Sequence, residues 1–122
     1  MFWRKKDTNT TAINWEPLNE VAQLEQILEE SKTQPILIYK HSTRCGISTM
    51  ALDRIEREWS EAGNHIKTYY LDLITYRNVS NIVAEMFNVW HQSPQVILIK
   101  DGKAIFDDSH MGISVQSILS HA

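Results

Sequence analysis

The chain has 122 residues and a formal net charge of −3 at pH 7. It is therefore long enough for one compact domain, residues 1–122, and lacks the basic excess typical of nucleic-acid binders. It contains no apolar stretch of signal-peptide or membrane-spanning length, and its single cysteine cannot form an internal disulfide. We therefore expect a cytoplasmic protein without nucleic-acid or membrane partners, in which residues 1–12 form a flexible N-terminal extension.

The first half of the chain alternates between helical and strand patterns. Residues 12–18 predict a short extended segment, and residues 19–31 have helical apolar spacing. Residues 35–40, PILIYK, are apolar on both sides, as expected of a strand buried in the middle of a sheet. A second helix is predicted to begin at Cys45. Its apolar face would contain Ile47, Met50, Ala51, Ile55 and Trp59, with Gly63 as its stop.

The second half continues this alternation and then changes direction. Residues 66–71 predict a strand, and residues 79–90 predict a helix with an apolar stripe in the core. Residues 93–100 predict another strand. The dipeptide Asp101-Gly102 is a strong signal for a two-residue hairpin, after which residues 103–107 would pair back antiparallel. The apolar stripe of the helix consists of Val79, Ile82, Val83, Met86, Phe87 and Trp90.

A final helix, capped by Ser114, completes the order β-α-β-α-β-α-β-β-α. Helical crossovers imply parallel strands early in the chain, and the hairpin implies an antiparallel pair late. The fold class is therefore α/β, with a mixed central sheet of about four to five strands. Helices must cover both faces of this sheet, because its central strands are too apolar to face water.

The only cysteine, Cys45, follows the buried strand and begins a helix. Free backbone N–H groups and the helix dipole favour a thiolate at such a position. The cationic groups of Lys40, His41 and Arg44 would add to this effect. The polar residues before Cys45 place it in a loop at the end of a central strand, where α/β sheets bind ligands. The alternative interpretation is a buried, inert cysteine.

Two further elements accompany the thiol. Ser48 lies three residues after Cys45, on the same side of the helix and one turn on. It can donate a hydrogen bond to a thiolate but cannot attack a disulfide, so a mixed disulfide on Cys45 would wait for an external thiol. An ordinary first-turn serine is the alternative. Ser93-Pro94 begins a strand, where an ordinary trans proline is also found, and we expect a cis peptide from the fold context.

Two segments, YKHSTRCGIST (residues 39–49) and HQSPQVILIKDGK (residues 91–103), carry a family resemblance. The chain resembles the thioredoxin superfamily over nearly its whole length and, more closely, the monothiol bacilliredoxin family, also described as bacillithiol system redox-active proteins of the YtxJ type. The resemblance implies a thioredoxin-like fold and a thiol-disulfide oxidoreductase. It would remove bacillithiol from protein cysteines, or transfer it, through a mixed disulfide on Cys45.

The resemblance also implies roles for individual residues. Cys45 would be the nucleophile, Ser48 the replacement for a resolving cysteine, and Pro94 a cis-proline facing the thiol. The expected thiolate-stabilising residues are Ser48, Gly46, Ile47, Arg44 and Lys40. The expected substrate-binding residues are Ser93, Pro94 and Thr43, together with His110 and Asp108 at the sugar-malate part of bacillithiol. No bound cofactor and no metal are expected; bacillithiol is a co-substrate, and the partners are bacillithiolated client proteins and a low-molecular-weight thiol.

The chain departs from the family pattern at Gly46, where members often have proline. Cys-Gly-x-Ser is also the pattern of monothiol glutaredoxins, which hold iron-sulfur clusters with glutathione. Those proteins have phenylalanine where this chain has Ile47, and a glycine pair where it has FDDSHMGIS, residues 106–114. A homodimeric iron-sulfur cluster scaffold is one alternative function, and a redox-inert thioredoxin-like interaction module is another.

Overall fold

The computed structural model describes residues 13–122, so the extension predicted over residues 1–12 lies outside the described residues. Within this range the chain forms five strands and four α-helices. The strands are β1 (Glu16–Pro17), β2 (Ile36–His41), β3 (Lys67–Asp72), β4 (Gln95–Lys100) and β5 (Lys103–Ser109). The helices are α1 (Ala22–Glu30), α2 (Gly46–Glu58), α3 (Arg77–Phe87) and α4 (Val115–His121), with short 3-10 turns η1 (Glu61–Gly63) and η2 (His110–Gly112).

The strands form one mixed sheet in the order β1-β3-β2-β4-β5. β3 pairs in parallel with both β1 and β2, whereas β4 pairs antiparallel with β2 and β5. The parallel pairing of β2 with β3 follows from the α2 crossover between them. The antiparallel pairing of β4 with β5 follows from the predicted hairpin at Asp101 and Gly102, whose φ angles are 53° and 77°. The prediction of a mixed α/β sheet is confirmed.

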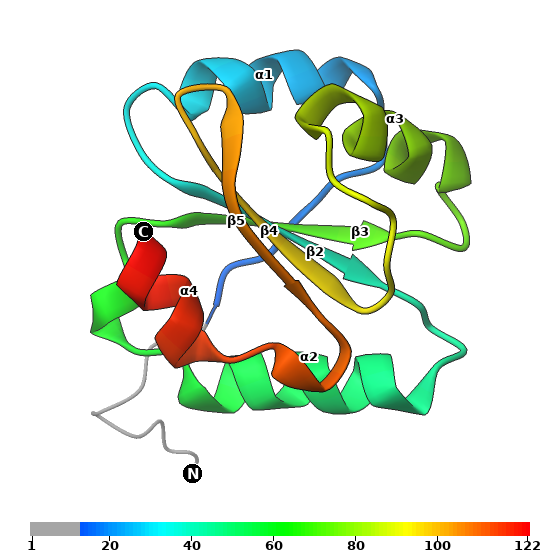
Figure 1. Ribbon diagram of the computed structural model, residues 1–122, viewed down its shortest axis with the longest axis vertical. Coiled ribbons are helices and arrows are strands. Elements are labelled where there is room, and N and C mark those ends of the chain that lie inside the picture. The colour runs from blue at the N-terminus through cyan, green and yellow to red at the C-terminus, as the bar shows by residue number, and fades with distance from the viewer. Residues whose placement is uncertain (1–12) are drawn as a thin grey trace, which may run out of the picture.

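Helices cover both faces of the sheet, as predicted (Figure 1). Every residue of β2 is buried, and its side chains alternate between two separate cores. Ile36 and Ile38 pack with α1 and α3, whereas Leu37 and Tyr39 pack with α2 and α4. No helix in residues 13–122 is long and apolar enough to cross a membrane.

The end of α2 differs from the prediction. The helix stops at Glu58, not at Gly63, and Trp59 continues in an extended conformation with ψ at 141°. The indole of Trp59 is buried against Gly63, where a Cβ atom would come within 2.5 Å of two ring carbons. Gly63 therefore does not end α2; it allows the indole of Trp59 to pack closely against the backbone.

In α2 and α3, the predicted apolar stripe contains more residues than the helix buries against the rest of the fold. α3 ends at Phe87 because Asn88 adopts a left-handed conformation, and Trp90, assigned to the core, is 89% exposed. Met86 is also partly exposed. In α2 the buried residues are Ser48, Ala51 and Ile55, whereas Ile47 and Met50 are 45% and 60% exposed. The stripe residues Met86, Trp90, Ile47 and Met50 are therefore corrected to surface positions.

The contact between Trp59 and Gly63 gives a stability prediction. Gly63→Ala should lower the free energy of unfolding by about 1–3 kcal/mol, because the new methyl group overpacks a buried ring. Urea unfolding followed by far-ultraviolet circular dichroism measures this change. Gly46→Ala is the matched control, since a Cβ at Gly46 meets no atom within 4 Å, and it should be neutral or stabilising. An unchanged unfolding midpoint for Gly63→Ala would contradict the packing argument.

Candidate active site

Cys45 lies where the central strand β2 turns into α2. Its backbone is extended, with φ at −111° and ψ at 120°, and it is the N-cap residue of α2. The Cys45 N–H donates to the Ser42 carbonyl at 3.1 Å, and the Cys45 carbonyl accepts from Thr49 N–H at 3.1 Å. The residue is partly exposed, and Thr43 and Arg44 beside it are exposed. The thiol therefore lies in an open loop at the carboxyl end of a central strand.

Ser48 is fully buried, and its polar atoms bond to β2 and to the loop that follows. Its hydroxyl accepts from Ser42 N–H at 3.1 Å and lies 2.7 Å from His41 Nδ1. Its carbonyl accepts from the Tyr39 hydroxyl at 2.7 Å. The partners of the Ser48 hydroxyl therefore lie in β2 and the following loop, whereas the ordinary first-turn serine given as the alternative would bond to helix N–H groups. A hydrogen bond from Ser48 to a Cys45 thiolate stays a prediction.

Tyr39 and His41 were not predicted from the sequence to be partners of Ser48. The signal was present, because residues two apart in a strand point to the same face, here the face that α2 covers. The His41 ring lies near two tyrosine rings, with centroids 5.9 Å from Tyr39 and 5.5 Å from Tyr70. Burial lowers the pKa of His41, although the carboxylates of Asp72 and Glu56 act in the opposite direction.

Lys40 points to the other face of the sheet. Its ammonium is fully buried and lies 3.3 Å from both the Ser80 carbonyl and His91 Nδ1. Burial lowers the pKa of Lys40 to about 8. The alternation of β2 thus places Lys40 against α3 and His41 against α2. The hydrogen bonds of Lys40 thus go to α3 and to His91, and its expected electrostatic effect on Cys45 stays a prediction.

The Ser93–Pro94 peptide is cis, which confirms the prediction for that bond. Pro94 is buried, and its carbonyl accepts from His110 N–H at 3.0 Å. The hydroxyl of Ser93 is buried and has no hydrogen-bond partner among the described residues. Pairing of β4 with β5 thus brings His110, which was predicted from the resemblance alone, next to Pro94.

Asp108 is placed differently from His110. Its carboxylate accepts from Ser109 N–H at 2.8 Å and lies against Gly112, where a Cβ atom would come within 2.8 Å of the carboxylate. Asp108 therefore packs on η2. Because η2 in turn contacts α2, the turn that contains His110 joins the Pro94 loop to the helix of the thiol. Of the remaining predicted residues, Gly46 and Ile47 are exposed in the first turn of α2.

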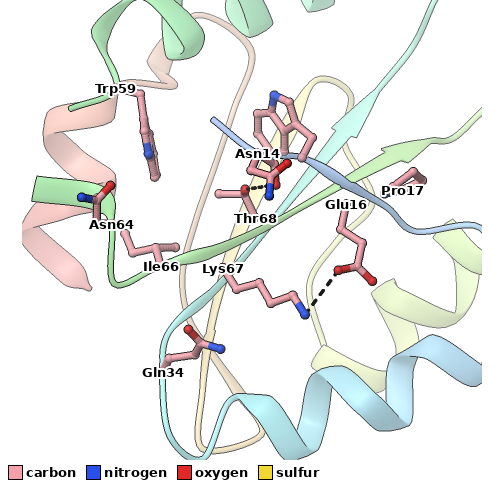
Figure 2. A pocket seen from close by; sticks show the side chains of 11 residues that line it. Asn14, Glu16, Pro17, Gln34, Trp59, Asn64, Ile66, Lys67 and Thr68 are labelled. Atoms are coloured by element: carbon pink, nitrogen blue, oxygen red, sulfur yellow. Dashed lines mark hydrogen bonds and ion pairs between the residues drawn. The ribbon is translucent and has the colours of Figure 1, made fainter. Parts of the chain in front are cut away.

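A separate pocket lies at the opposite end of the sheet (Figure 2). It has a volume of about 470 Å³ and includes Lys67, which forms an ion pair with Glu16 at 3.3 Å. Lys67 is the first residue of β3 and pairs with Ile36, the first residue of β2. Cys45 instead follows the last residue of β2, so this pocket is not part of the thiol site.

Comparisons with known proteins agree with this arrangement. The family model for the monothiol bacilliredoxin BrxC matches residues 16–118. A solved structure described, provisionally, as an oxidoreductase with a thioredoxin fold is 31% identical, with a TM-score of 0.75; the match covers 90% of this chain and 92% of that one. Thioredoxins from Malassezia sympodialis and Fasciola hepatica are 16% and 20% identical, with TM-scores of 0.74 and 0.68. Those matches cover 98% and 87% of this chain and 98% of each thioredoxin, and they show the fold alone.

The family match covers more than half of the chain and includes the Cys45 loop, α2 and the cis-Pro94 loop. The single thiol of the sequence thus lies at the N-cap of α2 in a thioredoxin fold. The chain belongs to the monothiol bacilliredoxin family of thioredoxin-fold oxidoreductases.

Proposed function

We propose that this protein removes bacillithiol from the cysteines of client proteins in the cytoplasm, with Cys45 as its nucleophile. The observation that carries the proposal is the pairing of Cys45 with Ser48. The one thiol of the chain is partly exposed at the N-cap of α2, and a buried serine occupies the position one turn on. Exchange on Cys45 therefore stops at a mixed disulfide, which is the defining step of a monothiol mechanism.

The proposed reaction has two exchange steps. The Cys45 thiolate attacks the bacillithiol sulfur of a modified client; a disulfide forms between Cys45 and bacillithiol, and the client disulfide breaks with its electron pair on the client sulfur. A second molecule of bacillithiol, as its thiolate, then attacks the bacillithiol sulfur on Cys45. This step releases oxidised bacillithiol and restores the Cys45 thiolate, so thiols and disulfides balance.

The surface near the thiol supports binding of a protein client and a polar thiol. Ile47 and Met50 expose apolar side chains in the first turns of α2, and Met111 in the neighbouring η2 is 66% exposed. The backbone at Ser93–Pro94 would bind the extended client chain. His110 and Thr43, both exposed, would contact the sugar-malate part of bacillithiol, whereas Asp108 would act indirectly by holding η2.

The first test is the formation of the mixed disulfide. Wild-type protein treated with oxidised bacillithiol should gain the mass of one bacillithiol, and reduced bacillithiol should remove it, because no second thiol in the chain can resolve the adduct. Intact-protein mass spectrometry reads both steps. Cys45→Ser should gain nothing, since an alkoxide is not available at neutral pH without a dedicated base. If a cysteine peptide forms the adduct and the wild-type protein does not, the proposed exchange is wrong.

The second test converts the protein to a dithiol. Ser48→Cys should form the same adduct first and then release bacillithiol without added reductant, because the new thiol lies one helical turn from Cys45. The final product should be an internal disulfide with a mass two hydrogens below that of the reduced variant. Persistence of the bacillithiol adduct in Ser48→Cys would show that position 48 does not reach the mixed disulfide.

A further inference from the structure

The loop between α3 and β4, residues 88–94, leads into the cis peptide and is held by few hydrogen bonds. Its middle, residues 90–92, is exposed. The Trp90 carbonyl accepts from Gln95 Nε2 at 2.9 Å. In the part of the chain that the structure describes, His91 is the only residue of this exposed middle whose side chain is hydrogen-bonded. The position of the loop therefore depends on what His91 contacts.

His91 bonds to two elements of the fold. Its Nδ1 atom lies 3.3 Å from Lys40 Nζ of β2 and 3.3 Å from Ser80 Oγ of α3. The fully buried ammonium of Lys40 also donates to the Ser80 carbonyl at 3.3 Å. Lys40 therefore bridges the helix and the loop from its place in the central strand.

The lysine also determines which nitrogen of His91 carries the proton. An ammonium donates hydrogen bonds but cannot accept them. Burial lowers the pKa of Lys40 to about 8, so the group is still charged at neutral pH. Burial and the charges of Lys40 and Arg77 lower the pKa of His91, so its ring is neutral there. Nδ1 must then be the acceptor, and the proton lies on Nε2.

The loop reaches the end of the sheet at which the thiol lies (Figure 1). Lys40 pairs with Gln95 between the antiparallel strands β2 and β4. Continuing this register by one residue places Pro94 beside His41, the last residue of β2. The segment that contains Cys45 begins directly after His41. Lys40 thus holds a loop that ends beside the thiol segment, although its own bonds go to the α3 side of the sheet.

We propose that Lys40 is a positioning residue for client exchange, because it holds the loop through His91 where the backbone of Ser93–Pro94 binds the client chain. The inference rests on the proposed function and deepens it, since it gives a buried residue a part in recognising the client. Strand-like hydrogen bonds form only with a peptide chain. Loss of the bridge should therefore slow exchange with a disulfide on a peptide more than exchange with a small disulfide.

Two probe disulfides measure this difference in the full chain. One is dithiobis(nitrobenzoate), and the other is the mixed disulfide of nitrothiobenzoate with an unstructured peptide that has one cysteine. With the second, the Cys45 thiolate attacks the peptide sulfur, a disulfide joins Cys45 to the peptide, and nitrothiobenzoate leaves with the electron pair. Absorbance of the released thiolate gives both rate constants. A change in the thiolate of Cys45 alters both alike, so the ratio of the peptide rate to the small-disulfide rate reports binding of the chain.

Lys40→Met keeps the length of the side chain but has no donor. It should lower the ratio about three- to tenfold, the effect of losing about one hydrogen bond. His91→Phe keeps a ring without Nδ1 and should lower the ratio by the same factor. The double variant should equal either single variant, because both changes break one bridge. An unchanged ratio in a folded variant, or additive effects of the two changes, would overturn the inference.

Lys67→Met is the matched control. It removes the same charge from the neighbouring strand β3 and breaks the ion pairs with Glu16 and Glu30, at the opposite end of the sheet. Its ratio should equal that of the wild type. A fall as large as that of Lys40→Met would assign the effect to general destabilisation and contradict a role for the bridge.

Nuclear magnetic resonance tests the bridge in the wild-type protein itself. The nitrogen resonances of the His91 ring should show the proton on Nε2, and a proton on Nδ1 of the neutral ring would overturn the inference. In Lys40→Met the titration midpoint of His91 should rise, because the ammonium 3.3 Å away is lost while Arg77 and Ser80 of α3 remain. An unchanged midpoint would show that the two side chains are not in contact.

None of these measurements uses bacillithiol, so the inference and the proposed substrate fail separately. A wild-type protein that forms no bacillithiol adduct but loses peptide exchange in Lys40→Met would reject bacillithiol as the substrate and keep the role of Lys40. Adduct formation with a peptide ratio that does not depend on Lys40 would reject the role of Lys40 alone.

Discussion

Burial of β2 on both faces is the constraint on which the rest of the structure depends. Because side chains alternate along a strand, each polar residue of β2 must find its partners on one face only. Tyr39 and His41 meet Ser48 of α2, and Lys40 meets Ser80 of α3. The two neighbouring ionisable residues, Lys40 and His41, thereby contact different helices, and only His41 bonds to the helix that Cys45 caps.

Ser48 links the chemistry of the thiol to the stability of the fold. A buried polar group without a partner costs about 1–3 kcal/mol, and here the hydroxyl and carbonyl of Ser48, the hydroxyl of Tyr39 and the N–H of Ser42 satisfy one another. A thiol at this position would be a weaker acceptor for Ser42 N–H. Ser48, which we propose leaves a mixed disulfide on Cys45 without an internal resolving thiol, is thus also a fixed part of the junction between β2 and α2.

The sequence was informative where local chemistry decides structure. Apolar runs indicated β2 and β4, Asp101-Gly102 indicated the hairpin, and Ser114 indicated the cap of α4, whose hydroxyl accepts from Ser117 N–H. Periodicity could not show how much of each helix the sheet covers, so Met50 and Trp90 were wrongly assigned to buried stripes. Nor could it show that Gly63 makes room for an indole, or which face of β2 each polar side chain would take, because those outcomes depend on the packing of distant segments.

Lys40 shows how a residue beside a site can act without touching it. Within residues 13–122 no carboxylate is hydrogen-bonded to its buried ammonium, which contacts His91 in the loop that leads to Pro94. Gln95, paired with Lys40 across the strands, donates to the Trp90 carbonyl of the same loop at 2.9 Å. The contacts of Lys40 and Gln95 hold the loop between Trp90 and Pro94 on the α3 side of β2. On the α2 side, His41 contacts Ser48. β2 therefore contacts two segments of the site: α2, through the bond between His41 and Ser48, and the loop that leads to cis-Pro94, through the bond between Lys40 and His91.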